Sequence, residues 1–202
     1  MRIFTSDRAL KWGGLDVPLL ALGLDCYGQS METVPGYCLI LDPEKLWFLA
    51  THRSPAVVHP KSRRGVFLPE LWKYDVAEVF IAHPPSGRYF EFNLAPNGAW
   101  WCCEFTAPRQ RAQQEEERMP GVETYADLAP DGGWLAAMAL PLDLLKARLD
   151  FGETSTLNVA MILNSPEQRF LSVEPLPGES PDFHQPASFP QAEFMALQDA
   201  MK

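Results

Sequence analysis

Residues 71–105 read LWKYDVAEVFIAHPPSGRYFEFNLAPNGAWWCCEF, and this stretch decides the fold. Two runs rich in β-branched and aromatic residues, 76–81 and 89–94, flank the turn sequence HPPSG. A second turn sequence, PNG at 96–98, leads into a third run at 99–105. Because Gly, Pro and Asn between short alternating runs signal tight turns, the stretch predicts three consecutive antiparallel strands.

Alternation along these runs separates an apolar face from a polar one, because successive side chains of a strand point to opposite sides of the sheet. Val79 and Ile81 of the first run share the apolar face with Phe90 and Phe92 of the second. A face of this kind is buried when a second sheet packs on it. We therefore expect these four side chains in the core between two sheets.

The other face carries a Glu at the middle of each of the first two strands, where a core strand would carry Val or Ile. A carboxylate there needs solvent, a partner or a ligand. Carboxylates and amides accept and donate to sugar hydroxyls, and aromatic rings stack on the C–H face of a pyranose. The alternative is an ordinary solvated sheet face. The candidate ligand-binding residues are Glu78, Tyr89, Glu91 and Asn93, with Trp72 at the edge and Trp100 from the third run.

Short runs of the same kind recur along the rest of the chain, separated by Gly, Pro, Asn and Asp. Such spacing predicts an all-β fold, a β-sandwich of two antiparallel sheets. The further candidate strands lie at 9–10, 17–24, 37–41, 47–51, 133–139, 157–163 and 169–173, with a final strand or tail at 192–197.

One segment, 141–149, has helical periodicity. It opens with Pro, which suits a first turn, and Leu142, Leu145 and Leu149 form one apolar stripe. We expect this short helix to cap one open end of the sandwich. The polar run 109–118 is predicted to be a solvated loop or short helix with no chemical role, and the proline-rich segment 175–190 to be an extended crossing segment.

Length and charge narrow the possible partners. The 202 residues suit a single domain over 1–202. The net charge of −9 argues against nucleic acid or an anionic membrane surface as the partner, and leaves a small-molecule or carbohydrate ligand open. There is no apolar run long enough to span a membrane, and residues 1–8 do not resemble a signal peptide, so we expect a cytoplasmic location.

Motifs for metal, cofactor or covalent chemistry are missing from the sequence. The four cysteines form no Cys-x-x-Cys pair and the four histidines have irregular spacing, so we expect no metal site. There is no phosphate-binding loop, dinucleotide fingerprint or nucleophile elbow, and we expect no cofactor. Neighbouring carboxylates also occur in retaining glycosidases, where they stand about 5 Å apart. Many non-catalytic proteins share that geometry, so the prediction is that the protein is not an enzyme.

Two segments, 71–111 and 181–189, resemble the DOMON-like group, which is related to carbohydrate-binding module family 9. The resemblance implies a β-sandwich with a ligand face. It matches Trp72 to a Trp that stacks on sugar and Glu78 to a Glu that accepts hydrogen bonds from hydroxyls. Glu91 stands where such relatives carry a basic residue, and their second stacking Trp has no counterpart that we can place. The late motif, PDFHQP at 181–186, adds His184 to the candidate ligand-binding residues.

The combined prediction is a non-catalytic domain that binds a ligand, with carbohydrate as the expected class. Because DOMON domains bind sugar or haem, a haem-binding or redox module is one alternative. A protein-interaction domain with a vestigial ligand face is the other. The sequence does not indicate an oligomeric state.

Overall fold

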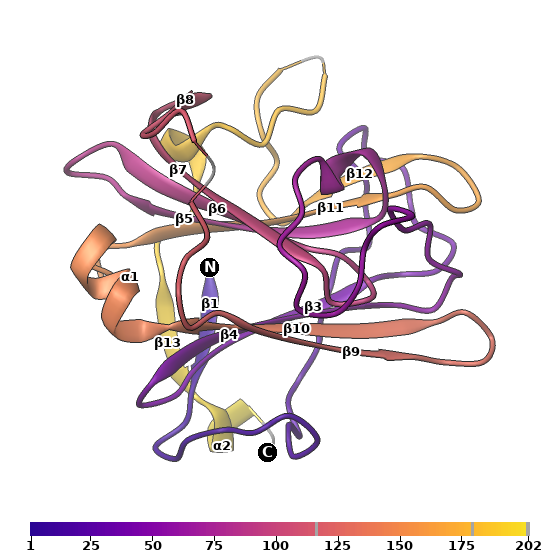
Figure 1. The fold of residues 1–202 in the computed structure, drawn as a ribbon, viewed down its shortest axis with the longest axis horizontal. Coiled ribbons are helices and arrows are strands. Elements are labelled where there is room, and N and C mark those ends of the chain that lie inside the picture. The colour runs from indigo at the N-terminus through magenta and orange to yellow at the C-terminus, as the bar shows by residue number, and fades with distance from the viewer. Residues whose placement is uncertain (116, 179, 201–202) are drawn as a thin grey trace.

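The computed structural model describes residues 1–115, 117–178 and 180–200. Within them the chain forms two β-sheets packed face to face, so the predicted all-β sandwich is confirmed (Figure 1). The first sheet contains β1 (Arg2–Thr5), β2 (Leu20–Ala21), β3 (Gly36–Leu41), β4 (Lys45–His52), β9 (Glu123–Leu128), β10 (Trp134–Pro141) and β13 (Glu193–Ala196). The second contains β5 (Val76–His83), β6 (Arg88–Leu94), β7 (Trp100–Ala107), β8 (Gln110–Arg111), β11 (Thr156–Leu163) and β12 (Arg169–Ser172).

The strand order is β13-β1-β3-β4-β10-β9 in the first sheet, with β2 paired to β3, and β12-β11-β5-β6-β7-β8 in the second. Neighbouring strands are antiparallel except around β1, which runs parallel to both β13 and β3. The predicted meander 76–105 is β5, β6 and β7, three adjacent strands of the second sheet.

Several of the shorter strands differ from the sequence prediction. No strand forms at 9–10, and of the predicted strand 17–24 only the two-residue β2 is present. β1 and β9 were not predicted. β1 is only four residues long, and β9 is an edge strand whose sequence, ETYADL, lacks an apolar face. The polar run predicted as a loop or helix begins with β8, which folds back on β7.

The predicted core is confirmed by register and burial. Val79 pairs with Phe92 and Ile81 with Phe90, and all four side chains are buried between the sheets. Of the neighbouring cysteines on β7, Cys102 faces this core and Cys103 the opposite side.

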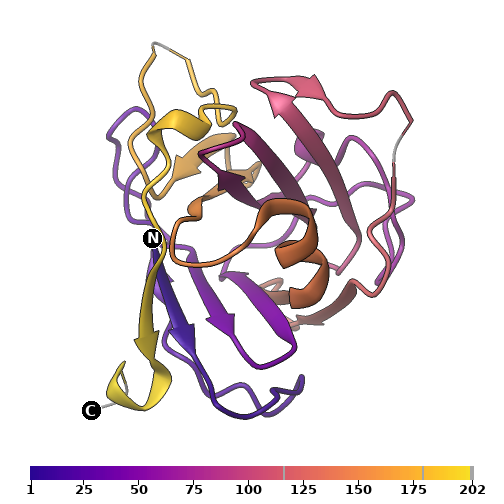
Figure 2. The ribbon, with the colours of Figure 1, turned by 90° about the vertical axis from the view of Figure 1, so that its left-hand side faces the viewer.

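The predicted helix is α1 (Leu142–Leu149), with Pro141 as its N-cap residue. It links β10 of the first sheet to β11 of the second and lies at one end of the sandwich (Figures 1 and 2). Leu142, Leu145 and Leu149 are its buried residues, as the apolar stripe predicted. The described helices, including the short α2 (Leu197–Ala200), do not have the length and apolar character needed to cross a membrane.

A buried carboxylate ties α1 to the second sheet. Glu104 of β7 is 7% exposed and accepts from Arg88 of β6 and from Arg148 of α1. The Arg148 Nε atom also lies 3.2 Å from Glu104 Oε2. The two guanidinium groups therefore share one buried carboxylate.

Replacing Glu104 by Ala should lower the free energy of unfolding by about 1–3 kcal/mol, because two arginines lose their buried acceptor while remaining partly solvated. The loss is measured in urea melts. The control is Glu117→Ala, since Glu117 is a half-exposed second partner of Arg148 and should cost less than about 0.5 kcal/mol. Similar losses for the two variants would show that Glu104 does not hold α1 in place.

The outer face of the second sheet is covered by two long segments. The first, between β4 and β5, includes the 3-10 helix η1 (Leu71–Lys73), and the second is the proline-rich segment 175–190 with η2 (Pro186–Ser188). Leu71 of the first, and Phe183 and Phe189 of the second, pack on the outer face around Phe80. A pocket opens on this face.

Candidate functional site

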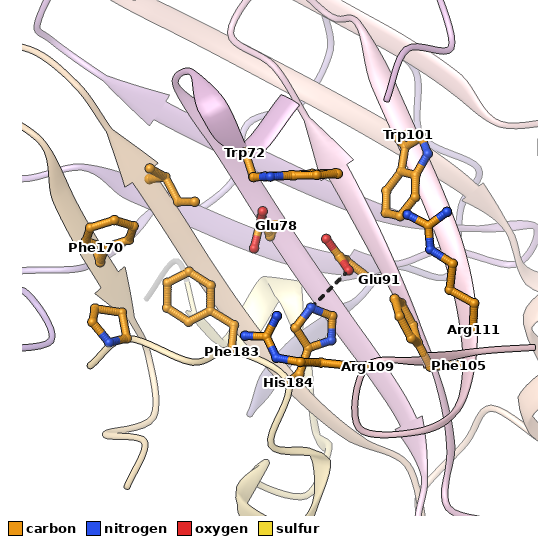
Figure 3. Close-up of a pocket in the computed structure, with 12 residues that line it drawn as sticks. Trp72, Glu78, Glu91, Trp101, Phe105, Arg109, Arg111, Phe170, Phe183 and His184 are labelled. Carbon is orange, nitrogen blue, oxygen red and sulfur yellow. Dashed lines mark ion pairs between the residues drawn. The ribbon is translucent and has the colours of Figure 1, made fainter. Parts of the chain in front are cut away.

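The pocket is a cavity of about 400 Å³ on the outer face of the second sheet (Figure 3). Its floor comes from the sheet and its walls come from η1, the β7–β8 hairpin and segment 175–190. The residues that line it are Trp72, Glu78, Glu91, Trp101, Phe105, Arg109, Arg111, Ile162, Phe170, Pro181, Phe183 and His184.

The two carboxyl groups on the floor come from adjacent strands. Glu78 of β5 lies opposite Asn93 of β6, and Phe80 lies opposite Glu91, so the two Glu residues are diagonal neighbours on one sheet face. Both side chains are almost fully buried, at 3% and 5% exposure. Figure 3 shows the two carboxylates close together, with the wall residues around them.

Aromatic rings form the walls. Trp72 packs edge to face on Trp101, with ring centroids 5.8 Å apart. Figure 3 shows Trp72 and Phe183 on opposite sides of the Glu78 carboxylate. A ligand in the pocket would therefore meet aromatic surface beside the carboxyl groups.

Glu91 is positioned by a chain of side-chain contacts. The Asn93 amide donates to Glu91 Oε1 at 2.9 Å, and His184 Nε2 lies 3.6 Å from Glu91 Oε2. The other nitrogen of the ring, His184 Nδ1, is 2.8 Å from the Tyr89 hydroxyl, which also accepts from the backbone N–H of Arg109 at 3.1 Å.

These contacts favour one tautomer of His184. Since the Tyr89 hydroxyl accepts from the Arg109 N–H, its own proton is available for His184 Nδ1. The ring proton is then on Nε2, facing Glu91. Such a neutral imidazole places a polarised N–H toward the carboxylate at a distance slightly longer than a hydrogen bond.

Burial shifts the pKa values of Glu78, Glu91 and His184. It raises the pKa of Glu78 well above its ordinary value, and the charge of Glu91 adds to this effect. Burial also raises the pKa of Glu91 to about 7, although Asn93 and the two arginines oppose the shift. The pKa of His184 falls to about 4, mainly because burial disfavours its charged form. Near neutral pH the histidine is uncharged and the carboxyl pair retains a proton.

Four of the predicted site residues line the pocket in the structure, namely Trp72, Glu78, Glu91 and His184. Tyr89 and Asn93 lie on the predicted face but are fully buried beneath it, where they contact His184 and Glu91. Their contribution to a ligand would act through those two residues.

The placement of Trp100 on this face was wrong. Trp100 pairs with Leu94, and its ring is buried between the sheets against Phe67, with centroids 5.0 Å apart. Trp101 pairs with Asn93 and lines the pocket instead. A shift of one residue along a strand moves a side chain to the other face, and the double Trp sequence gave no means of choosing between the two.

Sequence reasoning also missed Arg109 and Arg111, which belong to the polar run predicted as solvated. Arg111 pairs with Phe105 across the hairpin, and its guanidinium lies 5.3 Å from the Trp101 ring. Arg109 pairs with Asp182 at 2.8 Å across the pocket rim. Pro108 was the available signal, because Pro directly after a strand favours the tight turn that returns these side chains to the sheet.

No group of three or more His, Cys, Asp or Glu side chains is arranged to hold a metal ion in the part of the chain that the structure describes. Among these residues, the concentrated polar chemistry of the pocket is therefore a carboxyl pair, an imidazole and two guanidinium groups.

No protein-family model matches the chain, and no curated protein matches it. Solved structures do. A protein from Bacteroides uniformis to which carbohydrate binding is ascribed is 15% identical, with a TM-score of 0.71, covering 96% of this chain and 98% of the other.

A family 9 carbohydrate-binding module from Caldicellulosiruptor kristjanssonii, in complex with glucose, is 12% identical with a TM-score of 0.64, covering 97% of this chain and 96% of the module. A family 9 module from the same organism in complex with cellotriose is 14% identical with a TM-score of 0.62, covering 97% of this chain and 94% of the module. The chain is thus similar in fold, over nearly its whole length, to carbohydrate-binding modules of family 9.

Proposed function

We propose that the pocket of the second sheet binds a carbohydrate and performs no reaction on it. The observation that carries this proposal is the position of the Glu78 and Glu91 carboxyl groups between aromatic walls. Sugar hydroxyls bind carboxyl oxygens, and the C–H face of a pyranose stacks on an indole such as that of Trp72.

The similar structures support the proposal, since two of them hold glucose or cellotriose. Both segments that resemble the DOMON-like group also contribute to this one pocket. Segment 71–111 supplies Trp72 and both Glu residues, and segment 181–189 supplies Phe183 and His184. We therefore extend the proposal to a DOMON-like sugar-binding domain.

The haem alternative fits the pocket less well. A histidine ligates iron through a ring nitrogen with a free lone pair. In the favoured tautomer, the lone pair of His184 Nδ1 accepts from Tyr89 and Nε2 carries the proton toward Glu91, whose carboxylate lies 3.6 Å away. Iron binding would have to break one of these two contacts.

The test is isothermal titration calorimetry with glucose, xylose and cello-oligosaccharides. Trp72→Ala should weaken a sugar that binds by about 1–3 kcal/mol, because the stacking surface is lost. The control is Trp12→Ala, since Trp12 stacks on Tyr125 on the outer face of the first sheet. That variant should bind like the unmodified protein.

Two results would count against this function. One is a sugar affinity that is equal in Trp72→Ala and Trp12→Ala, which would place the site elsewhere. The other is release of shorter products from an oligosaccharide in a chromatographic assay, which would show catalysis. Thermal melting of both variants checks that neither substitution unfolds the protein.

A further inference from the structure

The buried Glu78 carboxyl on the floor of the pocket is unusual for a site that binds a neutral ligand. It lines the pocket at 3% exposure, yet it forms no hydrogen bond or ion pair with any residue in the described ranges. Buried carboxyl groups are normally hydrogen-bonded or paired, because their desolvation is costly. Glu78 therefore has acceptor capacity directed at whatever occupies the pocket.

The nearby basic side chains, Arg109 and Arg111, form their described contacts with residues other than Glu78. Arg109 pairs with Asp182 at the rim, where its side chain is 63% exposed, and Arg111 lies over the Trp101 ring. Both arginines lower the pKa of Glu91, whereas the charge of Glu91 raises that of Glu78. The floor is an acidic pair, and its more buried member forms no ion pair with the residues that the structure describes.

We propose that the sugar bound here carries a protonated amine, as a glucosamine unit does, and that its ammonium group lies against Glu78 and Glu91. This inference rests on the proposed function and names the class of sugar. It requires no group beyond the side chains of the pocket.

An ammonium group matches the floor in charge and in hydrogen bonding. It has three donors and no acceptor, and the two carboxylates have acceptors only. Its charge would favour the ionised form of both carboxyls, and aromatic ring faces such as that of Trp72 also attract cations. A sugar acid would bring a third negative group to the same floor, so the geometry favours the amine.

Amine binding should release protons. Near pH 7 the carboxyl pair holds a proton, and a cation that favours its ionised form displaces it. The preference for the amine should therefore shrink as the pH falls below about 7, where Glu91 protonates. The other titratable or charged groups around the pair are Tyr89, Arg109, Arg111, Asp182 and His184.

The experiment is calorimetric titration of the full chain at pH 7 with three disaccharides of the same size. These are the β-1,4 disaccharide of glucosamine, cellobiose and N,N′-diacetylchitobiose. The glucosamine disaccharide should bind at least about tenfold more tightly than the other two, the ratio expected of a charged hydrogen bond. Titration in buffers of different ionisation enthalpy should show proton release for this ligand alone.

The matched variant is Glu78→Gln, which keeps the shape of the side chain and removes its charge. It should lose the preference for the amine, so that the glucosamine disaccharide and cellobiose bind the variant with similar affinity, whatever the affinity for both. Glu115→Gln, at an exposed position in the polar run, should keep the preference. Thermal melting of Glu78→Gln beside the unmodified protein checks that the variant is folded.

The alternatives give different results. Equal binding of cellobiose and the glucosamine disaccharide would overturn the amine inference and leave carbohydrate binding intact. Tighter binding of a uronic acid disaccharide, or spermidine binding as tightly as the amino sugar, would also overturn it. No binding of any sugar would overturn both the inference and the proposed function.

Discussion

Phe92→Ala should lower the free energy of unfolding by about 3–5 kcal/mol, because it removes a buried ring and leaves a cavity. Phe92 is fully buried between the two sheets, opposite Val79. Its ring stacks on that of Phe90, with centroids 5.4 Å apart. The surrounding strands are fixed by their ladders, so the cavity can close only partly. Urea melts at constant pH give the loss directly.

The control for this variant is Glu115→Ala, at an exposed position in the polar run after β8. It should change the free energy of unfolding by less than about 0.5 kcal/mol. Equal losses in the two variants would contradict the assignment of Phe92 to the core between the sheets.

Glu91→Gln should become more stable relative to the unmodified protein as the pH rises, by about 3 kcal/mol between pH 4.5 and 7. In the unfolded chain Glu91 ionises near its ordinary pKa of 4.5, whereas in the folded protein burial raises that pKa to about 7. Between these values the folded state binds more protons than the unfolded state. The unmodified protein therefore loses stability there as the pH rises, and Gln does not titrate.

The difference between the two proteins is the quantity to measure, because His184 acts in the opposite sense. Its folded pKa is lowered to about 4 from 6.5, so it contributes stability that is lost as the pH falls through that range. In the unmodified protein the two effects largely offset each other. Urea melts of both proteins at several pH values isolate the contribution of Glu91, and Glu115→Gln is the control. A difference that does not change with pH would show that Glu91 ionises normally in the folded state.

The fold could be predicted to a large extent because one face of each central strand is apolar throughout. Ala77, Val79 and Ile81 of β5 share that face with Phe90, Phe92 and Leu94 of β6, and burial against a second sheet requires this period of two. β9 escaped prediction because an edge strand has one neighbour and partial solvent contact, so its sequence is weakly constrained. β1 lies between β13 and β3, and it escaped prediction because its four residues are too few to show a clear alternation.

The site could be predicted only where its residues belong to those strands or to the two motifs. Glu78 and Glu91 were found because carboxyl groups are exceptional in mid-strand. Arg109 and Arg111 were not, because an arginine in a polar run looks the same whether it faces solvent or returns over a sheet. Their position depends on the turn at Arg109, which has a positive φ of 59°. Pro108 indicates a turn there, but it does not indicate that the side chains after the turn lie over the pocket.

The parallel pairing of β1 with β13 has a consequence for the order in which the molecule is built during translation. β1 leaves the ribosome before the other described strands and β13 leaves it after them, yet the two form adjacent strands. Until β13 arrives, one side of β1 presents an unpaired row of amides and carbonyls, a surface that can pair with another nascent chain. The pairing of β1 with β13 therefore forms after the other described strands have been made, and slow synthesis of the segment between β12 and β13 lengthens the time during which β1 is open to misassembly.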